Sequence, residues 1–382
     1  MSRRVYITDT TLRDGEQSPD LAYTPLEKLT LAQCLLTEVG VDRIEVASAG
    51  ASPGEAEAVR CIAHWAKRAN LLHAIEVLGF CDGDYSPRWI AEQGAHNMNL
   101  LAKGSEMHCR EQLRATPTEH LAAIARSVCA AAQQGVRVSG VYLEDWSRGI
   151  EASPAYTLAL TEHVVRLGIS RIFLADTLGC LAPGSVTRHV ARMRCAFPHA
   201  HFEFHGHDDY GLATANCLAA VAAGADAVHV TANGLGERAG NAHLAEVVAV
   251  LHDHAAVVTG VDERALLRLS QLVEQVTARP VAHNTPIVGR DAFTQTAGVH
   301  ADGDRKGALY ASRLTPERFG RTRSYALGKL AGRASLELNL ETLGIALSPA
   351  RSAQLLTRIV ALADRKLAVH SADLLRLIDE LD

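Results

Sequence analysis

The sequence lacks long hydrophobic runs, clusters of basic residues and paired cysteine motifs. No apolar run approaches the roughly 18 residues of a membrane-spanning helix. No Lys/Arg-rich run accompanies the net charge of −5, which argues against nucleic acid and anionic membranes as partners. The eight cysteines are scattered without CxxC spacing, which favours a reducing cytoplasm over a disulfide-bonded exterior. We therefore expect a cytoplasmic protein that acts on small molecules.

A repeated strand and helix pattern predicts the fold. Eight short β-rich runs are each followed by a helical segment rich in alanine and leucine, at 5–11, 43–48, 74–80, 96–102, 137–144, 171–176, 201–207 and 226–232. Strands joined by helical crossovers pair in parallel, and eight such units predict a (β/α)8 TIM barrel. An open doubly wound sheet is the alternative, but no GxGxxG follows the first strand.

The pattern stops near residue 255. Residues 262–280 resemble a helix ended by Pro280, residues 281–310 are loop-rich, and residues 335–381 have the spacing of amphipathic helices. We expect a barrel at 1–260, a helix and linker subdomain at 261–325, and a small helical subdomain at 326–382.

The segment FEFHGHDDYG, residues 202–211, predicts a metal site. His205 and His207 are two residues apart in a strand, so their rings share one face about 6 to 7 Å apart, a good separation for chelating one cation. The alternative is one histidine in the core and one at a wet strand end. Two imidazoles need oxygen ligands to complete the shell, and Asp14 is the leading candidate because strands 1 and 7 are neighbours but one.

Other polar residues also follow the strands, where a barrel has its active-site rim. Asn241 is a weaker fourth ligand, or the N-cap of the next helix. Asp14 could instead pair with Arg13 or cap a helix. Arg13 beside a metal-bound carbonyl would supply a fixed donor for a developing oxyanion, unless it is a structural ion pair. Glu144 could transfer a proton or anchor another ligand.

Four motifs carry a resemblance to a known family. DTTLRDGEQ (9–17), HGHDDYGLATAN (205–216), NGLGERAGN (233–241) and TAGVHADG (296–303) resemble the acyl-CoA and 2-oxo-acid condensing enzymes related to isopropylmalate, homocitrate and citramalate synthases. Within that group, RIEVASA (43–49), VYLEDWS (141–147) and PERFGRTRSYALGKLAG (316–332) look most like the (R)-citramalate synthases. The resemblance covers nearly the whole chain.

The resemblance implies a reaction and a set of roles. Acetyl-CoA would condense with pyruvate, and hydrolysis of the thioester would release CoA. A divalent cation (Zn, Mn or Mg) would be held by Asp14, His205 and His207, with Asn241 nearby. Arg13 would steady the ketone oxygen, and Thr177 would hold the carboxylate of the 2-oxo acid.

The resemblance also implies a domain-swapped homodimer. Glu144 and His300 fit the base or proton relay, and His300, Asp302 and Tyr310 would complete the partner's site. The long loop after residue 280 would cross between subunits. The alternative is that these loop residues are ordinary surface residues.

The choice of 2-oxo acid is expected to depend on Leu78, Leu101 and Tyr142. These match the pocket positions of citramalate synthases, where bulky side chains leave room for a methyl group, although they could also be ordinary core residues. The same chemistry on 2-oxoisovalerate, 2-oxoglutarate or another oxo acid is the nearest alternative. A non-catalytic binding protein and an acyl-CoA lyase are more distant ones.

Two departures from the resembled family stand out. Asp208 replaces the asparagine of the usual HxHND motif, which would add negative charge near the metal if it faces inward. The C-terminal regulatory domain that many of these synthases carry is not expected, since the sequence ends after the small helical subdomain.

Overall fold

The computed structural model describes residues 3–381, which divide into two compact units after Val281. The first unit contains the barrel and the helix α10 (Leu266–Thr277). This helix packs on α1 (Pro25–Gln33), so the compact unit extends past the boundary expected at residue 260. Its apolar side buries Leu266, Leu269 and Val273, which explains why it belongs with the barrel.

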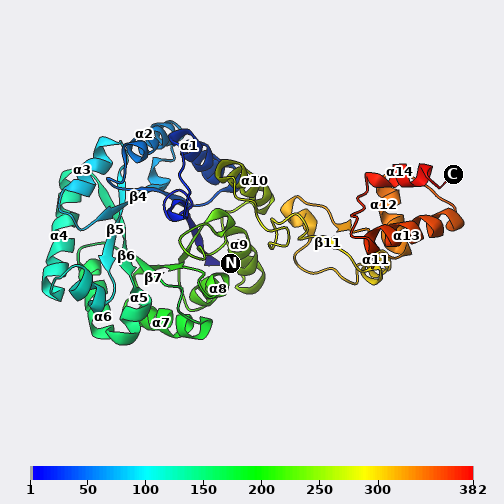
Figure 1. Ribbon diagram of the computed structural model, residues 1–382. Helices are drawn as coiled ribbons and strands as arrows, with labels where there is room; N and C mark the ends of the chain where they lie inside the picture. The colour runs from blue at the N-terminus through cyan, green and yellow to red at the C-terminus, as the bar shows by residue number, and fades with distance from the viewer. Residues whose placement is uncertain (1–2, 382) are drawn as a thin grey trace. The chain divides into compact units, whose positions relative to one another are not determined.

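Eight parallel strands close into a barrel, which confirms the predicted fold and excludes the open sheet (Figure 1). Their order around the barrel follows the sequence, and β9 pairs with β2 to close the ring. The strands are β2 (Tyr6–Asp9), β3 (Arg43–Ser48), β4 (Ile75–Phe80), β5 (Asn97–Lys103), β6 (Arg137–Glu144), β7 (Arg171–Asp176), β8 (His201–Gly206) and β9 (Ala227–Val230).

The helices form a ring outside the strands (Figure 1). Several begin at a threonine or serine followed by proline, because the hydroxyl caps the first turn and proline fits its first position. Thr24 and Thr116 each form a capping box with a glutamate three residues on. Besides α1 and α10 the helices are α2 (Pro53–Arg68), α3 (Tyr85–Glu92), α4 (Pro117–Gln133), α5 (Trp146–Ala152), α6 (Pro154–Arg166), α7 (Pro183–Ala196), α8 (Ala213–Ala222) and α9 (Leu244–His254).

The barrel interior carries charge as well as apolar side chains. Glu203, fully buried on β8, accepts from Arg171 at 2.6 Å and from Arg43 at 3.1 Å. His229 on β9 lies 3.0 Å from the other oxygen of Glu203. Burial would raise the pKa of Glu203, but Arg171 and Arg43 hold it well below its usual range. The Glu203 charge is therefore paired with two guanidinium groups, which offsets the cost of its burial.

The second unit has its own apolar core. The short strands β11 (Thr294–Gln295) and β12 (Ser324–Tyr325) pair in parallel, and α11 (Gly298–Arg305) lies in the segment expected to be loop-rich. The expected C-terminal helices are α12 (Arg333–Thr342), α13 (Pro349–Asp364) and α14 (Asp373–Asp379). The buried core of this unit contains Leu327, Leu336, Leu340, Leu355, Ile359, Val369, Leu374 and Leu377.

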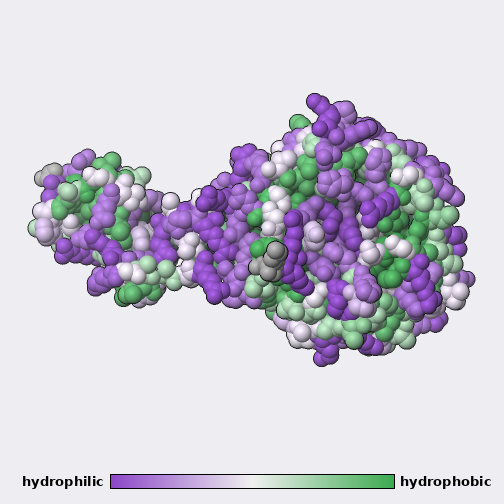
Figure 2. Space-filling model, turned by 180° about the vertical axis from the view of Figure 1, so that it is seen from behind, coloured by the Kyte–Doolittle hydropathy of each residue, from purple (hydrophilic) through white to green (hydrophobic). Residues whose placement is uncertain are grey.

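Among residues 3–381, no helix is long and apolar enough to cross a bilayer. Hydrophilic side chains cover much of the face of the barrel unit that Figure 2 shows, with hydrophobic residues in smaller patches. A short parallel pair of β1 (Arg3–Arg4) and β10 (Val257–Val258) lies outside the barrel.

We predict that Gly140→Ala destabilises the barrel. A Cβ at this position on β6 would lie 2.1 Å from the ring of Phe173, which is fully buried. Overpacking of this kind costs about 1–3 kcal/mol. Gly184→Ala on α7 is the matched control, because nothing lies within 4 Å of its added Cβ. Urea unfolding should show a lower free energy of unfolding for Gly140→Ala and an unchanged one for Gly184→Ala. Equal unfolding midpoints for the two variants would contradict the packing described here.

Candidate metal and oxo-acid site

Asp14, His205 and His207 form a compact group of buried metal-type donors at the carboxyl end of the barrel. One ligand atom from each lies within 4.8 Å of the other two. Asp14 Oδ2 is 3.2 Å from His205 Nε2 and 3.9 Å from His207 Nε2. This carboxylate oxygen accepts no well-aligned hydrogen bond, although it is buried. The predicted Asp14 and HxH cluster is therefore assembled by the fold.

The protonation states suit a cation. Burial alone would raise the pKa of Asp14, but Arg13 and His205 lower it below its usual range. Burial lowers the pKa of His205, and it lowers the pKa of His207 to about 4. A carboxylate and two neutral imidazoles result near neutral pH, which is the state that binds a divalent metal.

Side chains inside the barrel hold Arg13 in place. Its Nε donates to Glu45 on β3 at 2.6 Å, and its Nη2 donates to the Tyr142 hydroxyl at 3.2 Å. Tyr142 donates to Glu45 at 3.1 Å and lies 3.0 Å from His229 Nδ1. The ion pair with Asp14, at 3.3 Å, uses Oδ1 and leaves Oδ2 to the imidazoles. Asp14 can therefore keep its ion pair with Arg13 and offer its other oxygen to a cation.

The loop that carries Arg13 and Asp14 is tied down by a buried lysine that the sequence did not single out. Lys28 on α1 is 0% exposed and donates to the carbonyls of Leu12 at 2.7 Å and Val46 at 3.0 Å. Its ammonium also pairs with Glu16 at 2.6 Å and Glu55 at 2.5 Å.

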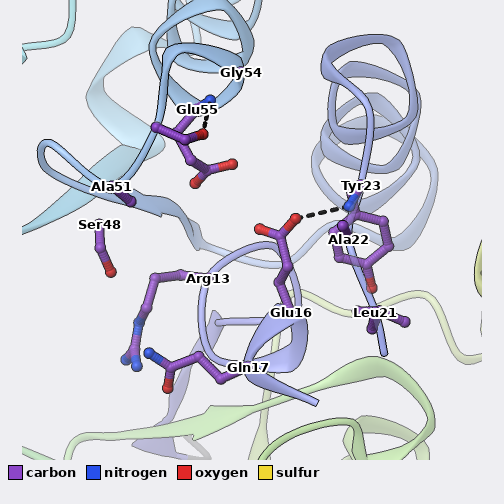
Figure 3. A pocket seen from close by; sticks show the side chains of 11 residues that line it. Arg13, Glu16, Gln17, Leu21, Ala22, Tyr23, Ser48, Ala51, Gly54 and Glu55 are labelled. Carbon is purple, nitrogen blue, oxygen red and sulfur yellow. Dashed lines mark hydrogen bonds between the residues drawn. The ribbon is translucent and has the colours of Figure 1, made fainter. Parts of the chain in front are cut away.

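A cavity of about 330 Å³ lies beside this loop (Figure 3). In it, Glu16 accepts from the Tyr23 amide at 2.7 Å, and Arg13 and Gln17 come from the same loop. Arg13, Gln17 and Ser48 also line a neighbouring cavity that includes His205 and His207.

Asn241 lies next to His207 through an isolated antiparallel bridge. Its amide nitrogen donates to the Leu235 carbonyl at 3.0 Å, and its Oδ1 is buried without a partner. The alternative of an N-cap is wrong, because His243 caps α9 by accepting from the Ala245 amide. The free amide oxygen fits a further metal ligand.

A cavity of about 260 Å³ gathers nine of the predicted residues. Its lining includes Arg13, Asp14, Leu78, Leu101, Tyr142, Glu144, Thr177, His205 and His207. Sequence reasoning missed other lining residues, namely Gln17, Ser48, Phe80, Ala175 and Glu237. Of these, Ser48 and Phe80 were open to prediction, since both end predicted strands.

Glu144 and Thr177 have partners of their own. The Glu144 carboxylate forms an ion pair with Lys103, the last residue of β5. The Thr177 hydroxyl accepts from the Asp145 amide at 2.8 Å, which leaves its own proton to donate into the cavity.

Asp208 does not line the cavity. Its Oδ1 accepts from the Ala213 amide at 2.8 Å, at the start of α8. The pKa of its carboxyl is raised, mainly by burial. The neighbouring Asp209 instead pairs with Arg238 at 2.7 Å. Asp208 therefore binds the amide at the start of α8 from the preceding loop, and the expected charge effect on the metal stays a prediction.

His300, Asp302 and Tyr310 lie in the second unit. The rings of His300 and Tyr310 pack with centroids 4.1 Å apart, and Asp302 pairs with Lys306 at 2.6 Å. The structure brings the histidine and tyrosine together, and their contribution to a partner's site stays a prediction.

The sequence matches the HMGL-like family model over residues 4–273, which is more than half of the chain. The chain belongs to the HMGL-like family. Residues 287–367 also match the model described as homocitrate synthase post-HMGL domain-like.

Two relatives of this HMGL-like chain span nearly all of it. A Methanopyrus kandleri protein that carries the name (R)-citramalate synthase is 37% identical over 99% of this chain and 72% of its own length. A 2-isopropylmalate synthase of Methylorubrum populi is 36% identical over 99% of this chain and 73% of its own length.

Solved structures agree on the fold. The crystal structure of hydroxymethylglutaryl-CoA lyase from Pseudomonas aeruginosa matches with a TM-score of 0.62 and 21% identity, over 74% of this chain and 95% of that one. At this identity the likeness shows the barrel fold alone.

We predict that His207→Ala abolishes metal binding. Changes to residues that only support ligands cost about 10–100-fold in affinity, so loss of a ligand should cost at least about 100-fold. The exposed His199→Ala is the matched control. Dialysis against manganese or zinc followed by elemental analysis should find metal in the wild type and the control. Equal metal content in His207→Ala would remove this imidazole from the site.

Proposed function

We propose that the chain is an acyltransferase that condenses acetyl-CoA with pyruvate and hydrolyses the thioester, giving (R)-citramalate and CoA. The observation that carries the proposal is the group Asp14, His205 and His207 beside Arg13 in a small cavity. A cation and a guanidinium at one point suit a 2-oxo acid, whose carboxylate and ketone are adjacent. The eight free cysteines fit a cytoplasmic location.

Proton transfer starts the reaction. The weakly acidic methyl group of acetyl-CoA gives a proton to a base, and its carbon forms a bond to the ketone carbon of the oxo acid. Glu144 lines the cavity and is the proposed base or relay. The ketone oxygen gains a proton to become the hydroxyl group, and water then cleaves the thioester to a carboxylate and the CoA thiol.

The ketone must be polarised for this attack. A Zn, Mn or Mg ion held by Asp14, His205, His207 and Asn241 would supply Lewis acidity when bound. Arg13 donates to the ketone oxygen as negative charge develops on it, and its guanidinium is already oriented by Glu45 at 2.6 Å. The Thr177 hydroxyl donates to the carboxylate of the oxo acid.

Pyruvate is the proposed acceptor because of the apolar wall. Leu78, Tyr142 and Phe173 pack with Ala175 and the partly buried Leu101. Tyr142 cannot swing aside easily, because its ring packs on Phe173 at 4.7 Å and its hydroxyl is held by Glu45 and Arg13. We infer that this wall favours a methyl group over a longer side chain on the oxo acid.

A second candidate is the same reaction on another 2-oxo acid, such as 2-oxoisovalerate or 2-oxoglutarate. Support comes from the relative named as a 2-isopropylmalate synthase and from the homocitrate synthase-like match of residues 287–367.

We also propose a homodimer in which the segment after residue 280 crosses between subunits, so that His300, Asp302 and Tyr310 complete the partner's site. Large apolar side chains near this segment support an interface. Tyr310 is 42% exposed, and Val299, Leu309 and Leu330 of the same unit are 62%, 69% and 67% exposed. Exposed apolar groups gathered in one segment are typical of a protein contact.

We predict that pyruvate is the best acceptor in a panel of oxo acids. Purified protein with acetyl-CoA and a divalent metal should release CoA thiol fastest with pyruvate. One methylene in an apolar pocket is worth about 1–3 kcal/mol, so kcat/KM for 2-oxoisovalerate should be at least roughly 10-fold lower. Leu101→Ala should narrow this gap by enlarging the cavity. A wild-type preference for a larger acid would contradict the pocket argument.

We predict that two inactive variants restore each other's activity when mixed. His300→Ala and His207→Ala each remove one half of the proposed site, so a mixed dimer would contain one complete site. Thiol release should reappear after the two chains are unfolded and refolded together. His300→Ala mixed with itself is the control. Continued inactivity of a mixed dimer whose presence is verified by tagged purification would contradict a shared site.

A further inference from the structure

The ion pair between Lys103 and Glu144 is a partly buried feature at the edge of the cavity. The side chains are 10% and 22% exposed, and the pair joins the carboxyl ends of β5 and β6. Glu144 lines the cavity beside the histidines. The lysine places a full positive charge next to the carboxylate that would take part in proton transfer.

The backbone of Lys103 is held on both sides by two buried side chains. Its amide donates to His120 Nε2 of α4 at 3.4 Å, and its carbonyl accepts from the Tyr156 hydroxyl of α6 at 2.9 Å. His120 Nδ1 lies 2.7 Å from the same hydroxyl.

One assignment of protons satisfies all three contacts. Tyr156 has a single hydroxyl proton and gives it to the carbonyl, so it accepts from a protonated Nδ1 of His120. Nε2 is then the acceptor for the Lys103 amide. This requires a neutral ring, which agrees with the pKa of His120, lowered to about 4 by burial and by the Lys103 charge.

The backbone of Glu144 is equally constrained. Its carbonyl accepts from the Gly104 amide at 2.6 Å. Asp145, the next residue, has a φ of 62°, a left-handed conformation that costs free energy for a residue other than glycine. Its buried carboxylate accepts from Ser105 at 2.7 Å and from Arg148 at 2.6 Å, which holds this conformation. Both ends of the ion pair are thus built on fixed backbone.

We propose that Lys103 is a positioning residue that orients the Glu144 carboxylate for proton transfer, and that His120 and Tyr156 clamp Lys103 in place. This inference rests on the proposed function. Without the ammonium, Glu144 keeps its backbone position but its side chain is free to rotate away from the reacting carbon.

The test compares Lys103→Met with Lys103→Arg. Misplacing a catalytic group by about 1 Å costs on the order of 100-fold in rate, so kcat of the methionine variant should fall roughly 10- to 100-fold with a smaller change in KM for the oxo acid. Lys103→Arg retains the charge and should recover a large part of kcat. The exposed Lys67→Met on α2 is the matched control and should behave as the wild type.

A second variant, Tyr156→Phe, removes the hydroxyl that holds the Lys103 carbonyl and leaves the ammonium in place. It should lower kcat less than Lys103→Met does. Thermal melts and circular dichroism verify that each variant folds. If Lys103→Met does not fold, the loss of kcat in Tyr156→Phe tests the proposal, and an unchanged kcat would contradict it.

The outcomes are separable. Lack of thiol release by the wild type with every oxo acid overturns the proposed function and this inference with it. An active wild type with a kcat for Lys103→Met within twofold of its own overturns the inference alone. Equal losses in the methionine and arginine variants also overturn it, because a charge that orients Glu144 should be replaceable in part by another.

Discussion

Closure of the barrel by β9 is the constraint on which the site depends. This strand pairs with β8 on one side and with β2 on the other. Asp14, near the start of the chain, is thereby placed 3.2 Å from His205, which lies far along the sequence. In an open sheet β2 and β8 would not share a neighbour, and the three donors would not meet.

Buried charge gives the site its precision. Asp14 uses one oxygen for Arg13 and keeps the other, unpartnered, facing two imidazoles that burial keeps neutral. Arg13 in turn depends on Glu45, and Lys28 ties the loop, through Leu12 and Glu16, to β3 and α2, through Val46 and Glu55. Removing charges from water costs several kcal/mol each, and close pairing offsets that cost. The same pairing restricts these side chains to one geometry.

The regular parts of the molecule were open to prediction from sequence. The βα period and the HxH spacing predict the barrel and the histidines, and barrel geometry then places Asp14 two strands away. Long-range pairing was not open to prediction. The ion pair of Lys103 with Glu144 depends on strand register, which no local pattern encodes. Asn241 was ambiguous because asparagine serves equally as cap or ligand; the cap formed by His243 excludes the first role, and the second stays a prediction. Helix α11 was missed because its eight residues include two glycines, which have low helix propensity.

The most direct test of this account is a crystal of the protein grown with Mn²⁺, examined by anomalous X-ray diffraction. We expect one strong peak at coordination distance, about 2.0–2.3 Å, from Asp14 Oδ2 and from one nitrogen each of His205 and His207. With pyruvate added, density for its carboxylate and ketone should adjoin that peak and face Arg13. An ion bound elsewhere, with these three side chains unliganded, would contradict the central claim.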